Sequence, residues 1–165
     1  MRKDHTIARG ELHRLRHQSV VLQGNSLGDP TEREVHVWTP PGWKPGEALP
    51  LLVDLKGYWS SALAHTNWQP SGENVPERLD RLAHEGMPRV VVVFPDCFTK
   101  LYGNQYLNSA GSGRYADYIC DEIVPFIEAK FGCGGQGKRG VFGKSSGGYG
   151  AAWHGLHRAD FWSAI

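Results

Sequence analysis

The chain has 165 residues, of which 40% are hydrophobic and 11% aromatic, and its formal net charge at pH 7 is +1. This length and composition are typical of one folded domain, and the near-neutral charge gives no indication of a nucleic-acid partner. No apolar run approaches the ~20 residues of a membrane span, and no apolar stretch follows the basic N-terminal residues as in a secretory signal.

The first third of the chain reads as strands separated by turns. Residues 1–10 are predicted to be a loose N-terminal tail, and the apolar run 19–22 predicts a first strand. Residues 35–39 alternate with the two-residue period of a half-buried strand, which a Pro-Pro-Gly sequence ends. A third strand is predicted over 49–55.

The middle of the chain combines helical patterns with one continuous apolar strand. A helix is predicted over 73–85, with a proline near its first turn and a glycine just past its end. The β-branched run 89–94 is typical of a strand buried on both faces, as in a parallel sheet covered by helices. An apolar stripe of helical period follows over 115–131, and Pro125 is expected to kink that helix.

The C-terminal segment predicts a strand over 139–142, a helix running to about His157, and the start of a further strand over 161–165. Strands that alternate with helices favour a layered α/β domain. No internal repeat or low-complexity tract interrupts this organisation.

A G-x-S-x-G motif occupies residues 143–147, directly between a predicted strand and a predicted helix. In a nucleophile elbow, the serine lies on a sharp and strained strand-to-helix turn. The flanking glycines let the strand and helix pass close together, because neither carries a Cβ atom. This context predicts that Ser145 projects its Oγ from the tip of the turn. The alternative is a glycine-rich turn without chemistry.

Two segments imitate a phosphate-binding loop, and neither satisfies the whole pattern. The sequence Gly-Lys-Ser at 143–145 lacks the earlier glycine of the pattern, since position 138 is lysine. The segment 132–138 has the required spacing, but Arg139 follows it instead of a hydroxyl residue, and it lies after a helix instead of after a strand. We therefore do not expect nucleotide binding.

The cysteines give no indication of a metal site or a disulfide framework. There are three of them, with no ligand-like spacing: Cys97, Cys120 and Cys133. Reduced structural thiols in a cytoplasmic protein are the expected state. No cluster of His, Cys and carboxylate residues has metal-ligand spacing, so we expect neither a metal nor an organic cofactor.

From about Arg33 onward, the order of segments resembles the esterase family of α/β-hydrolases, which includes S-formylglutathione hydrolases, enterochelin esterases, feruloyl esterases and mycolyl transferases. The matching segments are 39–42, 55–57, 94–96, 108–117, 122–125, 143–150 and 157–161. The resemblance implies a three-layer α/β-hydrolase fold with a mostly parallel sheet. It also implies a serine carboxylic-ester hydrolase that acts on a small-molecule ester through an acyl-enzyme.

The resemblance assigns site roles to three positions. Ser145 is expected to be the nucleophile, and the backbone N–H groups of Ser146 and Tyr58 are expected to stabilise the oxyanion. Two departures concern neighbouring side chains: Lys56 stands where the family commonly has histidine, and Ser146 stands where methionine or leucine is frequent. Backbone donors do not depend on side-chain identity, so these departures alter the pocket more than the chemistry.

Partners for the serine are harder to assign, because the family order along the chain is serine, acid, histidine. The residues of these types after Ser145 are His154, His157 and Asp160. The two histidines lie on the helix that leaves the elbow, so we expect them in packing or solvent, and Asp160 in a turn. The histidines before the serine have the wrong order, and we expect structural roles for them: His36, His65 and His84. His65 is the most open case, because its loop follows the predicted oxyanion glycine.

These observations predict no triad acid or histidine within residues 1–165. We interpret the chain as a single incomplete α/β-hydrolase domain, truncated after the elbow helix, with little esterase turnover of its own. Two alternatives remain open: an acyltransferase on the same fold, or a non-catalytic binding module that lacks the triad acid and histidine.

Four aromatic residues lie on loops expected near the strand ends, where α/β proteins bind ligands: Trp59, Trp68, Tyr102 and Tyr106. They fit stacking on a sugar or an aromatic acid, and they fit ordinary loop packing equally well. The sequence does not identify the ester substrate or the oligomeric state.

Overall fold

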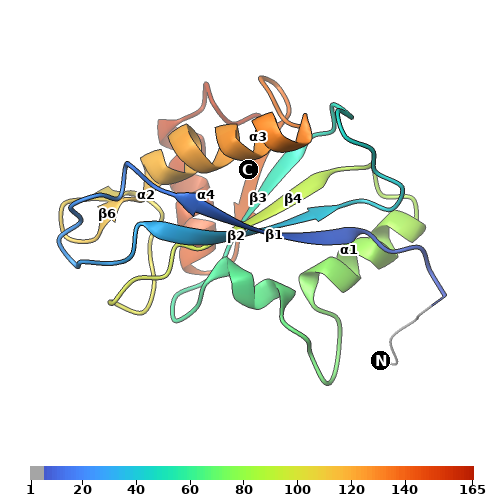
Figure 1. Ribbon diagram of the computed structural model, residues 1–165, viewed down its shortest axis with the longest axis horizontal. Helices are drawn as coiled ribbons and strands as arrows, with labels where there is room; N and C mark the ends of the chain where they lie inside the picture. The colour runs from blue at the N-terminus through green and yellow to red at the C-terminus, as the bar shows by residue number, and fades with distance from the viewer. Residues whose placement is uncertain (1–5) are drawn as a thin grey trace.

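A computed structural model describes residues 6–165, so Arg2, Lys3 and the first half of the predicted tail lie outside the described residues. A five-stranded sheet forms its centre (Figure 1), and its strands in spatial order are β1 (Glu11–Gln18), β2 (Glu32–Thr39), β4 (Val91–Pro95), β3 (Leu51–Leu55) and β7 (Arg139–Gly143). Strand β2 is antiparallel to β1 and β4, whereas β3 is parallel to both β4 and β7. The mostly parallel sheet expected from the sequence is therefore confirmed.

Helices cover both faces of this sheet (Figure 1), which gives the three layers expected. One face carries a 3₁₀ turn, η1 (Ala62–Thr66), and helix α1 (Val75–His84). The other face carries α4 (Ser146–His157) and one continuous helical run made of α2 (Tyr115–Asp117), η2 (Tyr118–Ile123) and α3 (Val124–Phe131). A two-stranded hairpin, β5 (Asn108–Ser109) and β6 (Gly113–Arg114), precedes that run.

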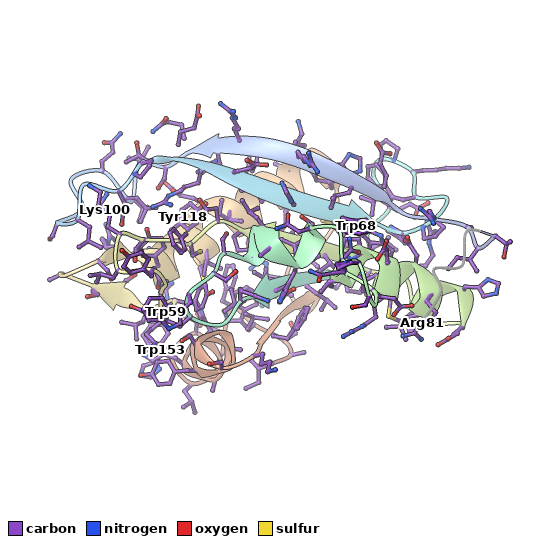
Figure 2. All side chains as sticks on the ribbon, turned by 90° about the horizontal axis from the view of Figure 1, so that it is seen from below. Trp59, Trp68, Arg81, Lys100, Tyr118 and Trp153 are labelled. Atoms are coloured by element: carbon purple, nitrogen blue, oxygen red, sulfur yellow. The ribbon has the colours of Figure 1, made fainter. Side chains whose placement is uncertain are left out.

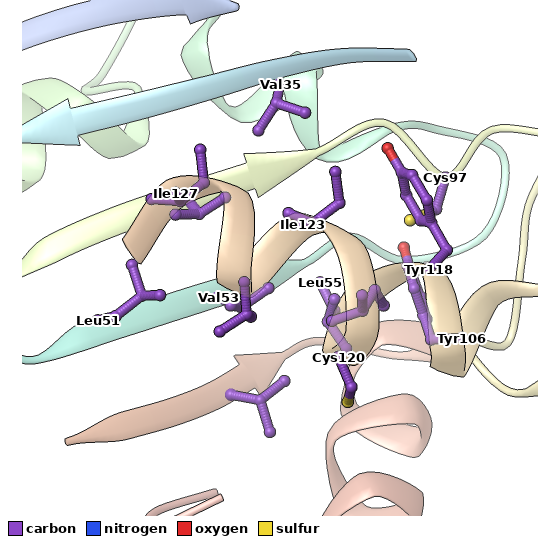
Figure 3. Close-up of a cluster of buried hydrophobic side chains, with 14 of the residues drawn as sticks. Val35, Leu51, Val53, Leu55, Cys97, Tyr106, Tyr118, Cys120, Ile123 and Ile127 are labelled. Atoms are coloured by element: carbon purple, nitrogen blue, oxygen red, sulfur yellow. The ribbon is translucent and has the colours of Figure 1, made fainter. Parts of the chain in front are cut away.

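The side chains of β4 are buried on both faces of the sheet, which places the sheet between two cores. Val91 and Val93 pack into the core beneath α3 and α4, while Val92 and Phe94 pack into a second core beneath α1. All four side chains are fully buried, as the β-branched run predicted. Figure 3 shows the larger core, where Val53 and Leu55 of β3 meet Ile123 and Ile127. Each buried side chain of this kind stabilises the fold by about 1.5–3 kcal/mol.

The strand predicted over 19–22 is wrong, because this segment is a turn bound by a carboxylate. Glu122 accepts hydrogen bonds from the backbone N–H groups of Val20 (2.8 Å) and Val21 (2.9 Å), and from the Ser19 hydroxyl (2.5 Å). These donors are therefore satisfied without a neighbouring strand. The first strand is β1, which lies at a sheet edge and is rich in charged and imidazole side chains. Such a strand has no apolar alternation from which it could be predicted.

The helix predicted over 115–131 is confirmed, and its irregularity takes the form of a π-helical segment. The wide turns of η2 end at Ile123, two residues before Pro125. Proline has no N–H to donate and its ring crowds the preceding turn, so a regular α-helix cannot continue through it. The wider turn accommodates the proline while Ile123 and Ile127 stay in the core.

The last residues begin to pair with β7, as the sequence predicted. Ala164 forms an isolated parallel bridge with Gly140, and its carbonyl accepts a hydrogen bond from Val141 N–H at 3.1 Å. Trp162 is buried in the core beneath α4. Within residues 6–165, no helix has the length and apolar character needed to cross a bilayer.

Candidate active site

Ser145 occupies a strained turn between β7 and α4. Its backbone angles are φ 59° and ψ −122°, outside the main regions that L-residues populate. Such a conformation costs about 1–3 kcal/mol and persists only where the surroundings enforce it. The side chain is exposed, so the turn presents the hydroxyl to solvent at the end of the sheet where β3, β4 and β7 all terminate.

The glycines of the motif are required by close backbone packing. A Cβ atom on Gly147 would lie 1.8 Å from the carbonyl oxygen of Leu55, and one on Gly143 would lie 2.4 Å from the same oxygen. Gly57, just after β3, lies against the serine, because a Cβ there would be 3.3 Å from Ser145 Cβ. The absence of side chains thus brings the end of β3 into contact with the turn, as the motif predicted.

The two predicted oxyanion donors flank this contact. Within residues 6–165, the backbone N–H groups of Tyr58 and Ser146 donate to no backbone or side-chain acceptor. Ser146 is the first residue of α4, where N–H groups have no intrahelical partner and the helix dipole favours negative charge. Tyr58 follows Gly57, which lies against Ser145, and Ser146 follows Ser145 itself. The two N–H groups therefore lie on either side of the contact between the end of β3 and the elbow.

Ser145 lies between two surface hollows. The first, of about 340 Å³, is lined by the segment after β3, by η1 and by the elbow: Lys56, Gly57, Tyr58, Trp59, His65, Lys144 and Ser145. The second, of about 500 Å³, is lined by Gln105, Leu107, Ser145, Ser146 and Tyr149. We call the first of these the β3 hollow. Its two lysine side chains give it positive charge.

Backbone strain is concentrated around these hollows. In the described chain, the non-glycine residues with positive φ are Trp59, Tyr102, Tyr106 and Ser145. Tyr106 is buried, and its hydroxyl donates a hydrogen bond of 2.5 Å to the carbonyl of Lys56, which holds the loop that leads to Gly57. Strained residues cluster where a binding or catalytic geometry has been selected over local stability.

Two of the four loop aromatics form an exposed pair beside the β3 hollow. Trp59 is 74% exposed and Tyr102 59% exposed, and their rings stack with centroids 5.4 Å apart. Tyr106, in contrast, packs in the core. Trp68 is also exposed, but Figure 2 shows it well away from Trp59. Of the two readings that the sequence left open, stacking on a ligand therefore fits Trp59 and Tyr102, and packing fits Tyr106.

The histidines after Ser145 lie away from its hydroxyl. His154 is fully buried on the inner face of α4, where its Nε2 lies 2.9 Å from the Tyr106 carbonyl and its Nδ1 accepts from the Trp162 indole at 3.2 Å. Burial lowers the pKa of His154 to about 4, so the ring is neutral and structural. His157 is exposed and stacks on Trp153, and Asp160 lies in an exposed turn.

Of the histidines before Ser145, two also lie outside the hollows. His36 is buried between the Thr66 hydroxyl (2.7 Å) and the Glu34 carboxylate (2.6 Å). His84 is exposed at the end of α1. These positions agree with the structural roles expected for both residues.

His65 differs from the others, because it lines the β3 hollow together with Ser145. Its Nδ1 lies 2.5 Å from Oδ2 of Asp54, whose side chain is only 3% exposed. This pair was not predicted from the sequence, because the family's chain order places the acid after the serine. The available signal was a lone aspartate inside the otherwise apolar strand Leu-Leu-Val-Asp-Leu.

The thiols are buried, and the described acidic residues form no metal site. The three cysteines are free and buried, and burial raises the pKa of Cys133 to about 11 and of Cys120 to about 12. These thiols are therefore protonated near neutral pH and poor nucleophiles. In the part of the chain that the structure describes, no group of three or more His, Cys, Asp or Glu residues is arranged to hold a metal ion.

Comparison with known proteins identifies the family of the chain. The family model described as "Putative esterase" matches residues 24–165. The chain belongs to this esterase family. A search of curated proteins found no match.

Solved structures of esterases share the fold of this family member. A ferulic acid esterase is 24% identical with a TM-score of 0.75, and the match covers 94% of this chain and 58% of that one. The ferulic acid esterase of Anaeromyces mucronatus, solved in complex with ferulic acid, is 18% identical with a TM-score of 0.75, covering 98% and 58%. An S-formylglutathione hydrolase from Agrobacterium tumefaciens is 22% identical with a TM-score of 0.70, covering 96% and 57%. The family and the α/β-hydrolase fold expected from the sequence are confirmed, and the chain spans somewhat more than half the length of these structures.

Proposed function

We propose that this chain carries the nucleophile and the oxyanion donors of a carboxylic-ester hydrolase that works through an acyl-enzyme on Ser145. The observation that carries the proposal is the strained, exposed backbone of Ser145, held against Gly57 at the end of β3. Membership of the esterase family supports ester hydrolysis as the reaction class. A turn that served only to connect β7 to α4 would have no reason to retain strain at an exposed serine.

In the proposed reaction, Ser145 Oγ attacks the ester carbonyl carbon while a base removes the hydroxyl proton. The carbonyl oxygen becomes negatively charged and accepts hydrogen bonds from the N–H groups of Ser146 and Tyr58. One donor of this kind is typically worth about 3 kcal/mol of transition-state stabilisation. Collapse of the intermediate releases the alcohol with the proton and leaves the acyl group on Ser145. Water then hydrolyses this ester by the same steps.

The substrate that best fits the surroundings is a small ester with an aromatic or sugar ring. Trp59 and Tyr102 present stacked, exposed rings at the rim of the β3 hollow. An exposed aromatic pair can stack on a flat ligand at little cost in conformational entropy. The fungal relative solved with ferulic acid offers an aromatic acid as the first candidate to assay.

An acyltransferase would use the same acyl-enzyme and differ only in the acceptor of the acyl group. Product analysis with an added sugar or alcohol separates the two reactions. A non-catalytic binding module, in contrast, would lose nothing when Ser145 is replaced by alanine.

Covalent labelling tests the proposal. The purified chain is incubated with a fluorophosphonate, and the adduct is located by intact mass and peptide mapping. We expect one adduct on Ser145, none in Ser145→Ala, and full labelling of Ser146→Ala, which keeps its backbone N–H. Labelling that is unchanged in Ser145→Ala, or absent from the wild-type chain, would contradict the proposed nucleophile.

A further inference from the structure

We propose that the ester hydrolysed at Ser145 carries a negatively charged group, and that Lys56 and Lys144 bind this group in the β3 hollow. The inference rests on the proposed function, because it names the substrate class of the site proposed above. The observation that carries it is a pair of ammonium groups without partners beside the nucleophile. The two lysines would select the substrate and take no part in the bond changes.

The two lysines reach the hollow from neighbouring strands. Lys56 directly follows β3, and Lys144 directly follows β7 and precedes Ser145. These strands are parallel, with Leu55 opposite Gly143, so the next residue of each leaves the sheet at the same edge. Both lysines line the β3 hollow together with Ser145. The register of the sheet therefore brings two positive charges to the nucleophile.

Neither ammonium group is engaged by the fold. Within residues 6–165, the Nζ atoms of Lys56 and Lys144 have no hydrogen-bond acceptor and no carboxylate partner. Two other lysines behave differently, because Lys100 and Lys138 donate to backbone carbonyls at 2.8 and 3.0 Å. A lysine ammonium has three donors and no acceptor. The donors of Lys56 and Lys144 are therefore available to an anion.

No carboxylate offsets this charge in the lining of the hollow. The other described residues that line it are Gly57, Tyr58, Trp59 and His65. Asp54 comes just before this segment, but its side chain is only 3% exposed and its Oδ2 lies 2.5 Å from His65 Nδ1. The second hollow beside the serine is also lined by described residues without an acid. The described lining around the nucleophile therefore contains cations and no anion.

The hollow also has the size and the ring contact that such a substrate needs. Its volume of about 340 Å³ is within the range of small-molecule sites. Trp59 lines it and stacks on Tyr102 with ring centroids 5.4 Å apart. A ring that stacks on Trp59 would place its anionic substituent in the same hollow as the two ammonium groups.

The type of cation defines which anions are suitable. Lysine is a compact point charge on a flexible stem, without the planar fork with which arginine matches a carboxylate in two places. A carboxylate and a phosphate therefore both satisfy the two lysines. The shared requirement is a negative charge on the ester, and the experiment distinguishes the two groups.

The test compares aryl acetates that differ in charge. The neutral probe is 4-acetoxybenzamide, and the anionic probes are 4-acetoxybenzoate and 4-acetoxyphenyl phosphate. Ligand-observed NMR titration measures their dissociation constants in Ser145→Ala, so that cleavage of the ester does not interfere. We expect each anion to bind about tenfold more tightly than the amide, because two exposed ion pairs each contribute about threefold. The tighter of the two anions identifies the preferred group.

Lysine variants and salt localise the effect. Lys56→Gln and Lys144→Gln should each weaken binding of the anions about threefold, and the double variant should bind the anions and the amide equally. Binding of the amide should stay unchanged in all three variants, which shows that the hollow is intact. Salt at about 1 M should also remove the preference, because the Debye length falls to about 3 Å.

Lys130→Gln is the matched control. Lys130 is an exposed lysine near the end of α3, and its Nζ also has no partner within the described residues. This helix end lies at the start of β7, where Glu128 pairs with Arg139, whereas Ser145 follows the end of the same strand. The control variant should therefore keep the full preference for the anions.

The outcomes separate the inference from the proposed function. Equal affinity for the anions and the amide in Ser145→Ala, or a preference that survives in the double lysine variant, would overturn the inference. Loss of amide binding in the lysine variants would also overturn it, because charge would not be what the lysines supply. Labelling of Ser145 by a neutral fluorophosphonate tests the proposed function separately. A labelled serine without a charge preference removes only the inference, whereas a charge preference without a labelled serine removes the hydrolase and leaves an anion-binding hollow.

Discussion

The polar groups at the ends of β3 and β7 differ sharply from those buried on the inner face of α4. At the strand ends, Ser145 is strained and exposed, and the N–H groups of Tyr58 and Ser146 have no acceptor within residues 6–165. On the inner face of α4, His154 has a partner on each ring nitrogen. Histidine occurs in both regions, and among the described histidines His65 is the one that lines a hollow together with Ser145.

The difference shows that polar residues of the same type serve different roles according to their surroundings. Buried polar groups with every partner in place fix the packing of a layer. Polar groups held in costly conformations without partners are typical of functional sites.

The packing of the elbow against β3 should be the most sensitive feature. Gly147→Ala places a Cβ against the Leu55 carbonyl, so it should lower the free energy of unfolding by about 3 kcal/mol. The same variant should lose fluorophosphonate labelling of Ser145. Chemical denaturation measures the change in the free energy of unfolding. Gly111→Ala is the control, since its Cβ would meet only Ser109 Oγ at 3.6 Å; equal stability of the two variants would refute the close approach.

The packing on the inner face of α4 should weaken as the pH falls. The pKa of His154 is about 4 in the fold, against 6.5 when unfolded, so between these values the unfolded chain binds more protons. Stability attributed to this residue is therefore complete above pH 6.5 and decreases by about 2 kcal/mol by pH 5. Denaturation at pH 7, 6 and 5 measures the slope. His154→Gln should flatten it and His157→Gln should not; an unchanged slope in His154→Gln would contradict the assignment.

The carboxylate that holds the 19–22 turn should contribute somewhat less. Glu122→Gln loses charge-assisted hydrogen bonds to the N–H groups of Val20 and Val21, and should cost about 1–2 kcal/mol. The control is Glu32→Gln, whose exposed pair with Arg16 is worth at most about 1 kcal/mol. Thermal unfolding of the two variants gives the comparison, and a larger loss in Glu32→Gln would count against the proposed role of the turn.

The exposed aromatic pair should affect binding without affecting stability. Trp59→Ala should change the free energy of unfolding by less than about 0.5 kcal/mol, but weaken binding of an aromatic acid by about tenfold, because one ring of the stacked pair is removed. Ligand titration by calorimetry measures this. Trp68→Ala, away from the hollow, is the control; similar weakening in both variants would show that the binding is not local.

Much of this organisation could be predicted from local pattern. Three features could be predicted because neighbouring residues determine them: the β-branched run of β4, the helical stripe ending at Phe131, and the glycines at 143 and 147. The elbow was predictable because its constraints are local: a strand, a turn that needs glycine, and a helix.

The rest depends on residues distant in the chain. The 19–22 segment is a turn because of Glu122, roughly a hundred residues later, and no pattern within the segment contains that information. In the same way, Asp54 and His65 meet only because η1 folds back across the end of β3. A rule based on chain order could not predict a pair that only the tertiary fold creates.

A crystal structure of the phosphonate adduct would test directly whether the turn at Ser145 is the catalytic centre. We expect phosphorus bonded to Ser145 Oγ, with one phosphoryl oxygen about 2.7–3.1 Å from the backbone nitrogens of Ser146 and Tyr58. An adduct on another residue, or a phosphoryl oxygen turned away from both nitrogens, would contradict the assignment of this turn as the catalytic centre.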